Sequence, residues 1–147
     1  KETWNPHIVF DPNFQQGEIR GSFDVRVDPG AIVRHEWRDA ASPYHIGPNL
    51  IIAADGNLSA NGKSIMAMKH GMWYHIAIDC IIGKNAPGRY TLTIKPPDGN
   101  AIVQSIPCPD NLLELRWFGF ISNANADTTF YLDNINIDQN PGKSKTD

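Results

Sequence analysis

The chain has 147 residues, of which 41% are hydrophobic and 20% are charged, and it contains 12 glycines and 11 prolines. This length favours one domain with its own core, and this composition excludes a disordered chain, a collagen and a coiled coil. The 13 Lys and Arg residues and 16 Asp and Glu residues give a formal charge of −3. The sequence therefore has no basic field for nucleic acid or an anionic membrane, and its short apolar runs cannot span a bilayer.

The two ends of the sequence differ from its interior. Residues 1–4 contain neither an initiator methionine nor an apolar signal region, which indicates either a removed signal or a domain cut from a longer chain. Residues 140–147 are polar and include Pro141 and Gly142, which predicts a tail or linker. We therefore expect a single domain over residues 1–139, followed by this tail.

Short runs of alternating apolar and polar residues, separated by turn dipeptides, dominate the interior. In residues 22–28, Phe23, Val25 and Val27 share one face and polar residues occupy the other, which is the period of a half-buried strand. No segment predicts a helix longer than about one turn. Regularly spaced short strands predict an all-β fold, an antiparallel β-sandwich or jelly roll. The expected strands cover residues 22–28, 31–39, 49–54, 57–60, 63–68, 71–82, 89–95, 101–106, 113–122 and 129–137.

Turn residues join several of these strands. Asp55-Gly56 and Asn61-Gly62 are two-residue loops that suit type I′ hairpin turns, and they predict a three-strand meander between residues 49 and 68. The last strand is expected to alternate strictly, so that one of its faces carries four side chains, Tyr131, Asp133, Ile135 and Ile137.

Two cysteines, Cys80 and Cys108, leave two interpretations open. They are either two buried small thiols or a disulfide between neighbouring β-segments, which would contribute about 3–4 kcal/mol if unstrained. Two cysteines are weak evidence for an oxidising compartment, so the sequence does not decide between these alternatives.

Motifs of the main catalytic classes are absent from the sequence. The stretch from Gly56 to Ser64 resembles a phosphate loop, but it has one residue too many between its glycines and leads into an expected strand rather than a phosphate-binding helix. There is no Gly-x-Ser-x-Gly nucleophile elbow. None of the four glutamates belongs to a Glu-x-Asp or Glu-x-Glu pair, which is what two catalytic carboxylates on one strand face would need.

The density of polar and aromatic residues is highest in residues 34–39. Alternation places Arg34, Glu36 and Arg38 on one face of the strand, and it turns Trp37 and its neighbour His35 to the other. If the Trp37 face is core, the Arg-Glu-Arg row points to solvent. Such a row is either a cross-strand charge ladder on a wet face or a set of ligand contacts.

Sugars are bound by planar hydrogen-bonding groups combined with an aromatic plane, and an arginine-rich face also suits carboxylated or sulfated sugars. We expect Arg26 to extend the Arg-Glu-Arg row from a neighbouring strand, and Tyr44, with His45 beside it, to lie in the following loop. Large aromatics dominate sandwich cores, so the tryptophans favour core positions. The aromatic residues expected at the surface are Tyr44, Phe118 and, if its strand faces the groove, Trp73. The candidate ligand-binding residues are Arg26, Arg34, Glu36, Arg38, Tyr44, His45 and Trp73.

Residues 71–78, 88–94 and 97–99 carry a Trp-Tyr-His strand, a short loop and a second strand that ends at an Asp-Gly turn. In this the chain resembles the concanavalin A-like lectin/glucanase superfamily, including its laminin-G-like and pentraxin-like domains. Residues 130–137 resemble the closing strand of carbohydrate-binding jelly rolls. Residues 22–26 and 35–39 resemble bacterial sandwich modules attached to larger polysaccharide-acting proteins.

The resemblance implies two curved antiparallel sheets, with ligands on the concave sheet or at its loop rim. It also implies a structural calcium ion near Asp133 of the final strand, with Asp11 as the N-terminal carboxylate. The Glu-x-Asp-x-x-Glu signature of laminarinase-type hydrolases and the Gln-Ile-His motif of the alginate-lyase branch are absent from the sequence.

We therefore expect a non-catalytic carbohydrate-binding module of an extracellular polysaccharide-processing protein, secreted or at a bacterial cell surface. Its partners would be a polysaccharide or oligosaccharide and a neighbouring catalytic domain, with no nucleic acid and no membrane. One alternative is a lyase or hydrolase that uses Tyr44 as acid, His45 as base and Arg38 to neutralise charge. A second alternative is a structural sandwich that packs on a catalytic domain.

Overall fold

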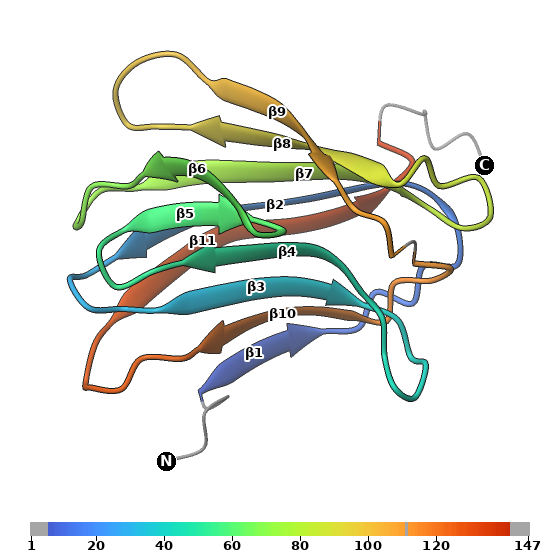
Figure 1. The fold of residues 1–147 in the computed structure, drawn as a ribbon, viewed down its shortest axis with the longest axis horizontal. Helices are drawn as coiled ribbons and strands as arrows, with labels where there is room; N and C mark the ends of the chain where they lie inside the picture. Colours follow the sequence, from blue (N-terminus) through green and yellow to red (C-terminus); the bar gives the residue numbers. More distant parts are fainter. Residues whose placement is uncertain (1–5, 111, 142–147) are drawn as a thin grey trace.

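The computed structural model of the protein describes residues 6–110 and 112–141, which form eleven β-strands in two antiparallel sheets (Figure 1). The expected core position of Trp4 and most of the expected tail lie outside these residues. No helix in the described part of the chain is long and apolar enough to cross a membrane. The six-stranded sheet has the order β1 (His7–Phe10), β10 (Trp117–Ser122), β3 (Val33–Arg38), β4 (Ile46–Ile52), β5 (Asn57–Ala60) and β6 (Lys63–Ala67). The five-stranded sheet has the order β11 (Phe130–Gln139), β2 (Gly17–Val27), β7 (Tyr74–Ile82), β8 (Arg89–Lys95) and β9 (Ile102–Pro107).

One hydrophobic core lies between the two sheets. Each sheet sends alternate side chains inward, so a period of two along the strand becomes a buried layer. Trp37 and Phe118 from the six-stranded sheet are fully buried, as are Phe23 and Ile76 from the five-stranded sheet. The predicted antiparallel sandwich is therefore confirmed. The prediction of an exposed Phe118 is wrong, because this side chain is an inward residue of β10.

The chain passes from one sheet to the other between β2 and β3. The Pro29-Gly30 turn, in which Gly30 has a φ of 85°, contains a hydrogen bond from Ala31 N–H to Asp28 O at 3.1 Å. It is not a hairpin turn, because β3 pairs with β4 and β10, whereas β2 pairs with β7 and β11. Side chains that point outward from β2 and β3 therefore lie on opposite sides of the sandwich.

The two predicted type I′ turns differ in outcome. Asn61 and Gly62 have φ values of 45° and 83°, as a type I′ turn requires, and Ala60 pairs with Lys63. The Asp55-Gly56 connection is longer than predicted, because Gly56 N–H bonds to Ala53 O at 2.9 Å and only Gly56 has a positive φ. That is a type I turn followed by a left-handed glycine. The predicted meander of β4, β5 and β6 is nevertheless confirmed.

The last strand, β11, does not alternate strictly. Its pairing with β2 shifts register between Asp133 and Asn136, and Asn134 inside this bulge has a φ of 50°. Tyr131 and Asp133 consequently point outward, whereas the isoleucines beyond the bulge pack against the core. The prediction of one shared face is therefore wrong, since an extra residue reverses the alternation.

Cys80 and Cys108 are both buried free thiols. Cys80 pairs with Tyr90 on β8, whereas Cys108 N–H bonds to the carbonyl oxygen of Gly88, just before β8, from the side of β9. Two strand spacings of about 4.8 Å separate their backbones, which exceeds the reach of a disulfide. Burial raises the pKa of Cys80 to about 12 and that of Cys108 to about 11, so both thiols remain protonated near neutral pH.

Candidate functional site

The outer face of β3 carries the Arg-Glu-Arg row that the sequence predicts. Trp37 is fully buried and His35 is 2% exposed on the inner face. Alternation then directs Arg34, Glu36 and Arg38 to the outside of the six-stranded sheet. We call these three residues the Arg-Glu-Arg ladder.

Glu36 is buried although its side chain points away from the core. Its carboxylate accepts hydrogen bonds at 2.7 Å from Nε of Arg38, whose Nη2 also lies at 2.7 Å, and Nη1 of Arg34 is at 3.5 Å. The residue opposite Glu36 on β10 is Gly119, which contributes no side chain there. The charged carboxylate is tolerated at 1% exposure because two guanidinium groups surround it. The ladder as a whole keeps one positive charge in excess.

Arg38 is held between two aromatic rings. Its guanidinium carbon lies 3.8 Å from the ring centre of Trp117 and 4.3 Å from that of Tyr44, which are cation–π distances. With two of its nitrogens on Glu36, the Arg38 side chain is only 17% exposed. Arg38 therefore fixes the two rings on the sheet surface.

Trp117 is a site residue that the sequence analysis missed. A Cβ atom at Gly119 would overlap the far edge of the Trp117 indole, so the ring lies flat over this glycine. A signal was present in the sequence. Phe118 and Phe120 alternate with Trp117 and Gly119, and two inward phenylalanines require an outward tryptophan.

Arg34 is the residue of the ladder with the fewest partners within the protein. Its side chain is 42% exposed, its contact with Glu36 is long, and its Nε is buried without a hydrogen-bond partner. Asn49 pairs with Glu36 from β4, and its Oδ1 is likewise buried and unpartnered. Unsatisfied buried polar atoms are rare in folded proteins. These two atoms mark the part of the face where the protein does not complete its own hydrogen bonding.

His45 lies beyond the end of β3, beside Tyr44. Its Nδ1 is 2.6 Å from Oδ2 of Asp39, and Oδ1 of Asp39 accepts the backbone N–H groups of His45 at 2.8 Å and Ala41 at 3.1 Å. Burial alone would raise the pKa of Asp39, but these hydrogen bonds outweigh it and lower that pKa. The loop that carries Tyr44 is thus anchored by an ionised carboxylate.

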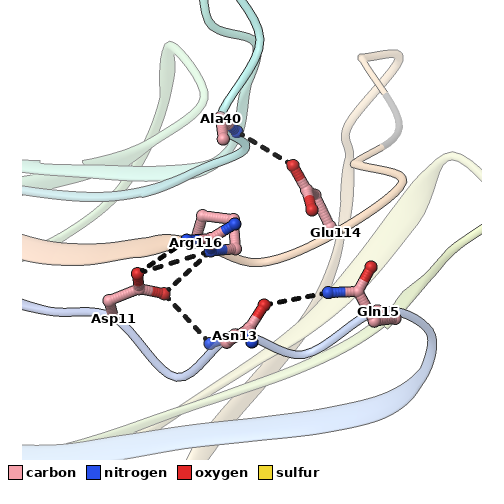
Figure 2. Close-up of polar contacts among 6 residues, drawn as sticks. All are labelled: Asp11, Asn13, Gln15, Ala40, Glu114 and Arg116. Atoms are coloured by element: carbon pink, nitrogen blue, oxygen red, sulfur yellow. Dashed lines mark hydrogen bonds and ion pairs between the residues drawn. The ribbon is translucent and has the colours of Figure 1, made fainter.

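An open hollow of about 680 Å³, which we call the rim hollow, begins at the same loop. Figure 2 shows how the segments around it are joined. Arg116 places Nε and Nη2 on the carboxylate of Asp11, each with a shortest distance of 3.1 Å, and Glu114 accepts the N–H of Ala40 at 3.3 Å. The rim hollow is edged by carboxylates, an imidazole and an amide rather than by guanidinium groups. Its lining residues are Gln15, Asp39, Ala40, Ala41, His45, Leu113 and Glu114.

Two of the predicted ligand-binding residues do not join the ladder. Arg26 points outward from β2, and register places Trp73 beside it, next to the start of β7. Both therefore lie on the outer face of the five-stranded sheet, across the sandwich from Arg34 and Arg38. Sequence reasoning treated the strands on either side of Pro29-Gly30 as neighbours, which they are not.

The implied calcium residues each have partners within the protein. The hydrogen bond from Arg116 lowers the pKa of Asp11, and Oδ1 of Asp133 accepts the Asn134 N–H at 2.8 Å. No group of three or more His, Cys, Asp and Glu residues that could hold a metal ion occurs in residues 6–110 and 112–141. Calcium binding therefore stays a prediction.

Comparisons with known proteins agree on the fold. No family model and no curated protein sequence matches the chain. A segment of a chain named "Sialidase" is similar, with a TM-score of 0.67 and 12% identity, covering 94% of this chain but only 15% of that one. The PL-14 alginate lyase from Aplysia kurodai is similar over 85% of this chain and 70% of its own, with a TM-score of 0.58 and 12% identity. A tetrameric galectin from the ball sponge Cinachyrella sp. is similar over 90% and 99%, with a TM-score of 0.54 and 17% identity.

At these identities the similarity shows the fold alone. The protein shares its antiparallel β-sandwich fold with these three structures, which agrees with the jelly-roll fold that the sequence predicts. The particular role of this chain has to be argued from its own side chains.

Proposed function

We propose that this domain is a non-catalytic module that binds an anionic glycan on the outer face of its six-stranded sheet. The observation that carries this proposal is the state of Arg34. Its side chain is 42% exposed, and its buried Nε has no partner. The only carboxylate of the ladder, Glu36, is already held at 2.7 Å by Arg38. The excess positive charge is therefore presented by Arg34.

The surroundings of Arg34 suit a sugar acid. A carboxylate or sulfate group can take two parallel N–H donors from one guanidinium, which a lysine could not offer in the same geometry. The exposed ring of Tyr44, which Arg38 fixes, offers an apolar face to a pyranose ring farther along the sheet. Asn49 and, on the next strand, Ser59 offer polar groups for hydroxyls on the other side. A few such contacts give micromolar to millimolar affinity.

The similar structures support a glycan ligand without specifying it. They are named as a sialidase, an alginate lyase and a galectin, and alginate is a polymer of carboxylated sugars. The sialidase segment shows that this fold occurs as a small part of a much longer chain. We accordingly propose that the domain works beside a catalytic domain in a secreted or cell-surface protein.

One observation favours the lyase alternative and another opposes it. His45 and Asp39 form an oriented imidazole–carboxylate pair next to Tyr44, which is an arrangement that general-base catalysis uses. Arg38, however, is occupied by Glu36 and covered by two rings, so it is not free to neutralise a substrate carboxylate. A binding role fits the ladder better than a catalytic one.

The test is affinity electrophoresis and calorimetry with alginate, polygalacturonate and a sulfated galactan, with dextran as the neutral control. We expect Arg34→Ala to weaken binding of at least one anionic polymer about tenfold or more, because a bidentate ionic contact is lost. The matched control is Arg89→Ala, which removes the same charge from an exposed residue of the other sheet.

Equal binding by Arg34→Ala and the unmodified protein would overturn the proposal. An equal loss of binding in Arg34→Ala and Arg89→Ala would also overturn it, because it would indicate unspecific charge attraction. Turnover is measured on the same polymers by the ultraviolet absorbance of unsaturated products and by reducing ends. Product formation that is lost in His45→Ala would favour the lyase alternative over the binding module.

A further inference from the structure

A second group of exposed aromatic and charged residues lies on the other side of the sandwich. Register places Arg26 of β2 between Tyr131 of β11 and Trp73, which immediately precedes β7. Trp73 is 41% exposed and Tyr131 is 38% exposed. Their ring centres are 6.4 Å apart, and the guanidinium carbon of Arg26 lies 4.5 Å from the centre of the Tyr131 ring. We call these three residues the aromatic stripe.

The side chains of the aromatic stripe have few partners within the protein. Arg26 is half-buried beside the Tyr131 ring, and its Nε is buried with no hydrogen-bond partner. The rings of Trp73 and Tyr131 are tilted by 59° and do not stack on one another. Two large aromatic rings are thus exposed to solvent next to a buried N–H donor that has no partner. Exposed aromatic pairs and unpartnered buried donors are both uncommon in folded proteins.

The neighbouring row supplies fixed hydrogen-bond acceptors. Asp24 lies one pleat along β2 from Arg26, on the same face. Its carboxylate is held by Nδ1 of His75 at 2.6 Å and by Nδ2 of Asn134 at 2.7 Å. The Asn134 contact exists because the bulge in β11 turns this residue toward β2. Asp133 faces Asp24 across the strand pair, so acceptors are concentrated beside the aromatic rings.

The charge of this face selects among ligands. One guanidinium stands beside two carboxylates, so the stripe lacks the positive excess of the ladder and does not favour an anion. Carboxylates that accept hydrogen bonds match hydroxyl donors, Arg26 matches a hydroxyl or ring oxygen, and aromatic faces match the C–H face of a pyranose. A neutral sugar combines all three properties.

We propose that the aromatic stripe is a second glycan-binding site, that its ligand is a neutral glycan, and that it acts independently of the ladder. Trp73 and Tyr131 cover the sugar ring, Arg26 donates to it, and Asp24 and Asp133 accept from its hydroxyls. The proposal stands whether or not the ladder binds anionic glycans, because none of its residues belongs to the six-stranded sheet.

The experiment titrates the protein with cellohexaose, xylohexaose and mannohexaose up to millimolar concentration, followed by calorimetry and by ligand-observed NMR. We expect at least one hexaose to bind, and Trp73→Ala and Tyr131→Ala each to weaken that binding about tenfold or more, as for other central aromatic contacts. Trp73→Phe, which keeps an aromatic face, should recover part of the affinity.

The controls separate this site from the ladder and from general effects. Val103→Ala removes an apolar side chain that is 63% exposed on the same sheet and should bind like the unmodified protein. Arg34→Ala should also retain hexaose binding, even if it loses anionic polymers. Unchanged binding in Trp73→Ala or the absence of binding by all three hexaoses would overturn the proposal. So would a dimer, seen by sedimentation, that Trp73→Ala dissociates, because the stripe would then be covered by a second copy of the chain.

Discussion

Two neighbouring residues show how one strand accommodates ionisable side chains on its outer and inner faces. Glu36 on the outer face is buried but retains two guanidinium partners, whereas His35, its neighbour in sequence, is buried on the inner face and has no charged partner among its hydrogen bonds. Burial without a charged partner favours the neutral form of His35. Removal of one partner would leave Glu36 as an uncompensated buried charge, which is why Arg38 is a stability residue as well as a site residue.

The tautomer of His35 follows from its partners. Trp37 Nε1 can only donate, and it lies 3.0 Å from Nε2 of His35, so Nε2 is the acceptor. The proton is therefore on Nδ1, which donates to the carbonyl oxygen of Gly119 at 2.9 Å. Protonation would break the bond to Trp37 and place a charge among the rings of Phe118 and Phe120. Burial accordingly lowers the pKa of His35 from 6.5 to about 3.

The stability of the fold should therefore fall with acid. Between pH 6.5 and about 3 the unfolded chain binds a proton at His35 that the folded chain does not. The free energy of unfolding then decreases by up to about 1.4 kcal/mol per pH unit as the pH falls. Urea unfolding at a series of pH values should show this slope in the unmodified protein and a shallower slope in His35→Gln, which keeps an acceptor and a donor. NMR detection of His35 protonation above pH 5 in the folded protein would contradict this account.

At the scale of the strand, close approach of the two sheets depends on a glycine in β2. A Cβ atom at Gly21 would lie 2.5 Å from the Phe118 ring and 2.7 Å from the Trp37 ring. Both rings are fully buried, so neither has room to move away. The backbone of β2 can therefore pass over these rings only without a side chain.

We expect Gly21→Ala to destabilise the protein by about 1–3 kcal/mol, which is the typical cost of overpacking a core. The reduced entropy of the unfolded chain offsets less than about 1 kcal/mol of this. Thermal and urea unfolding measure the effect, with Thr91→Ala on the exposed outer face of the same sheet as the control. Equal stability of Gly21→Ala and the unmodified protein would show that the sheets can separate at little cost.

The strands also show which features a sequence can predict. Alternation in residues 34–38 was sufficient to place the ladder on one face, because a period of two is a local property. The separation of Arg26 from Arg34 was not predictable, because a Pro-Gly turn is compatible both with a hairpin and with a passage between sheets. The outward direction of Asp133 together with inward isoleucines depends on a bulge. The sequence marks this bulge by a change of phase, from apolar residues at Phe130 and Leu132 to Ile135 and Ile137, which an interpretation as strict alternation overlooks. The unpartnered atoms of Arg34 and Asn49 depend on distances between strands, which only the assembled sheet defines.

At the scale of the whole molecule, the two outer faces differ in charge and in chemistry. The six-stranded sheet presents an excess guanidinium and two rings fixed by Arg38, whereas the five-stranded sheet presents two exposed rings beside Asp24 and Asp133. A core about 10 Å thick lies between the sheets, so the two faces share no contact residues. Effects of substitutions on one face should therefore add to those on the other. A single small domain could in this way hold two chemically different glycans at once.

Simultaneous occupancy can be tested directly by capture between two polymers. Beads coated with alginate are incubated with the protein and then with a soluble xylan or glucomannan, chosen by the hexaose that binds. We expect the unmodified protein to retain the neutral polymer on the beads, because each face holds one of the two polysaccharides. Arg34→Ala should lose the protein from the beads, Trp73→Ala should keep the protein but lose the neutral polymer, and Arg89→Ala with Val103→Ala should behave like the unmodified protein. Retention of the neutral polymer by Trp73→Ala would mean that one face binds both polymers, and the separation of the molecule into an anionic-glycan face and a neutral-glycan face would then be wrong.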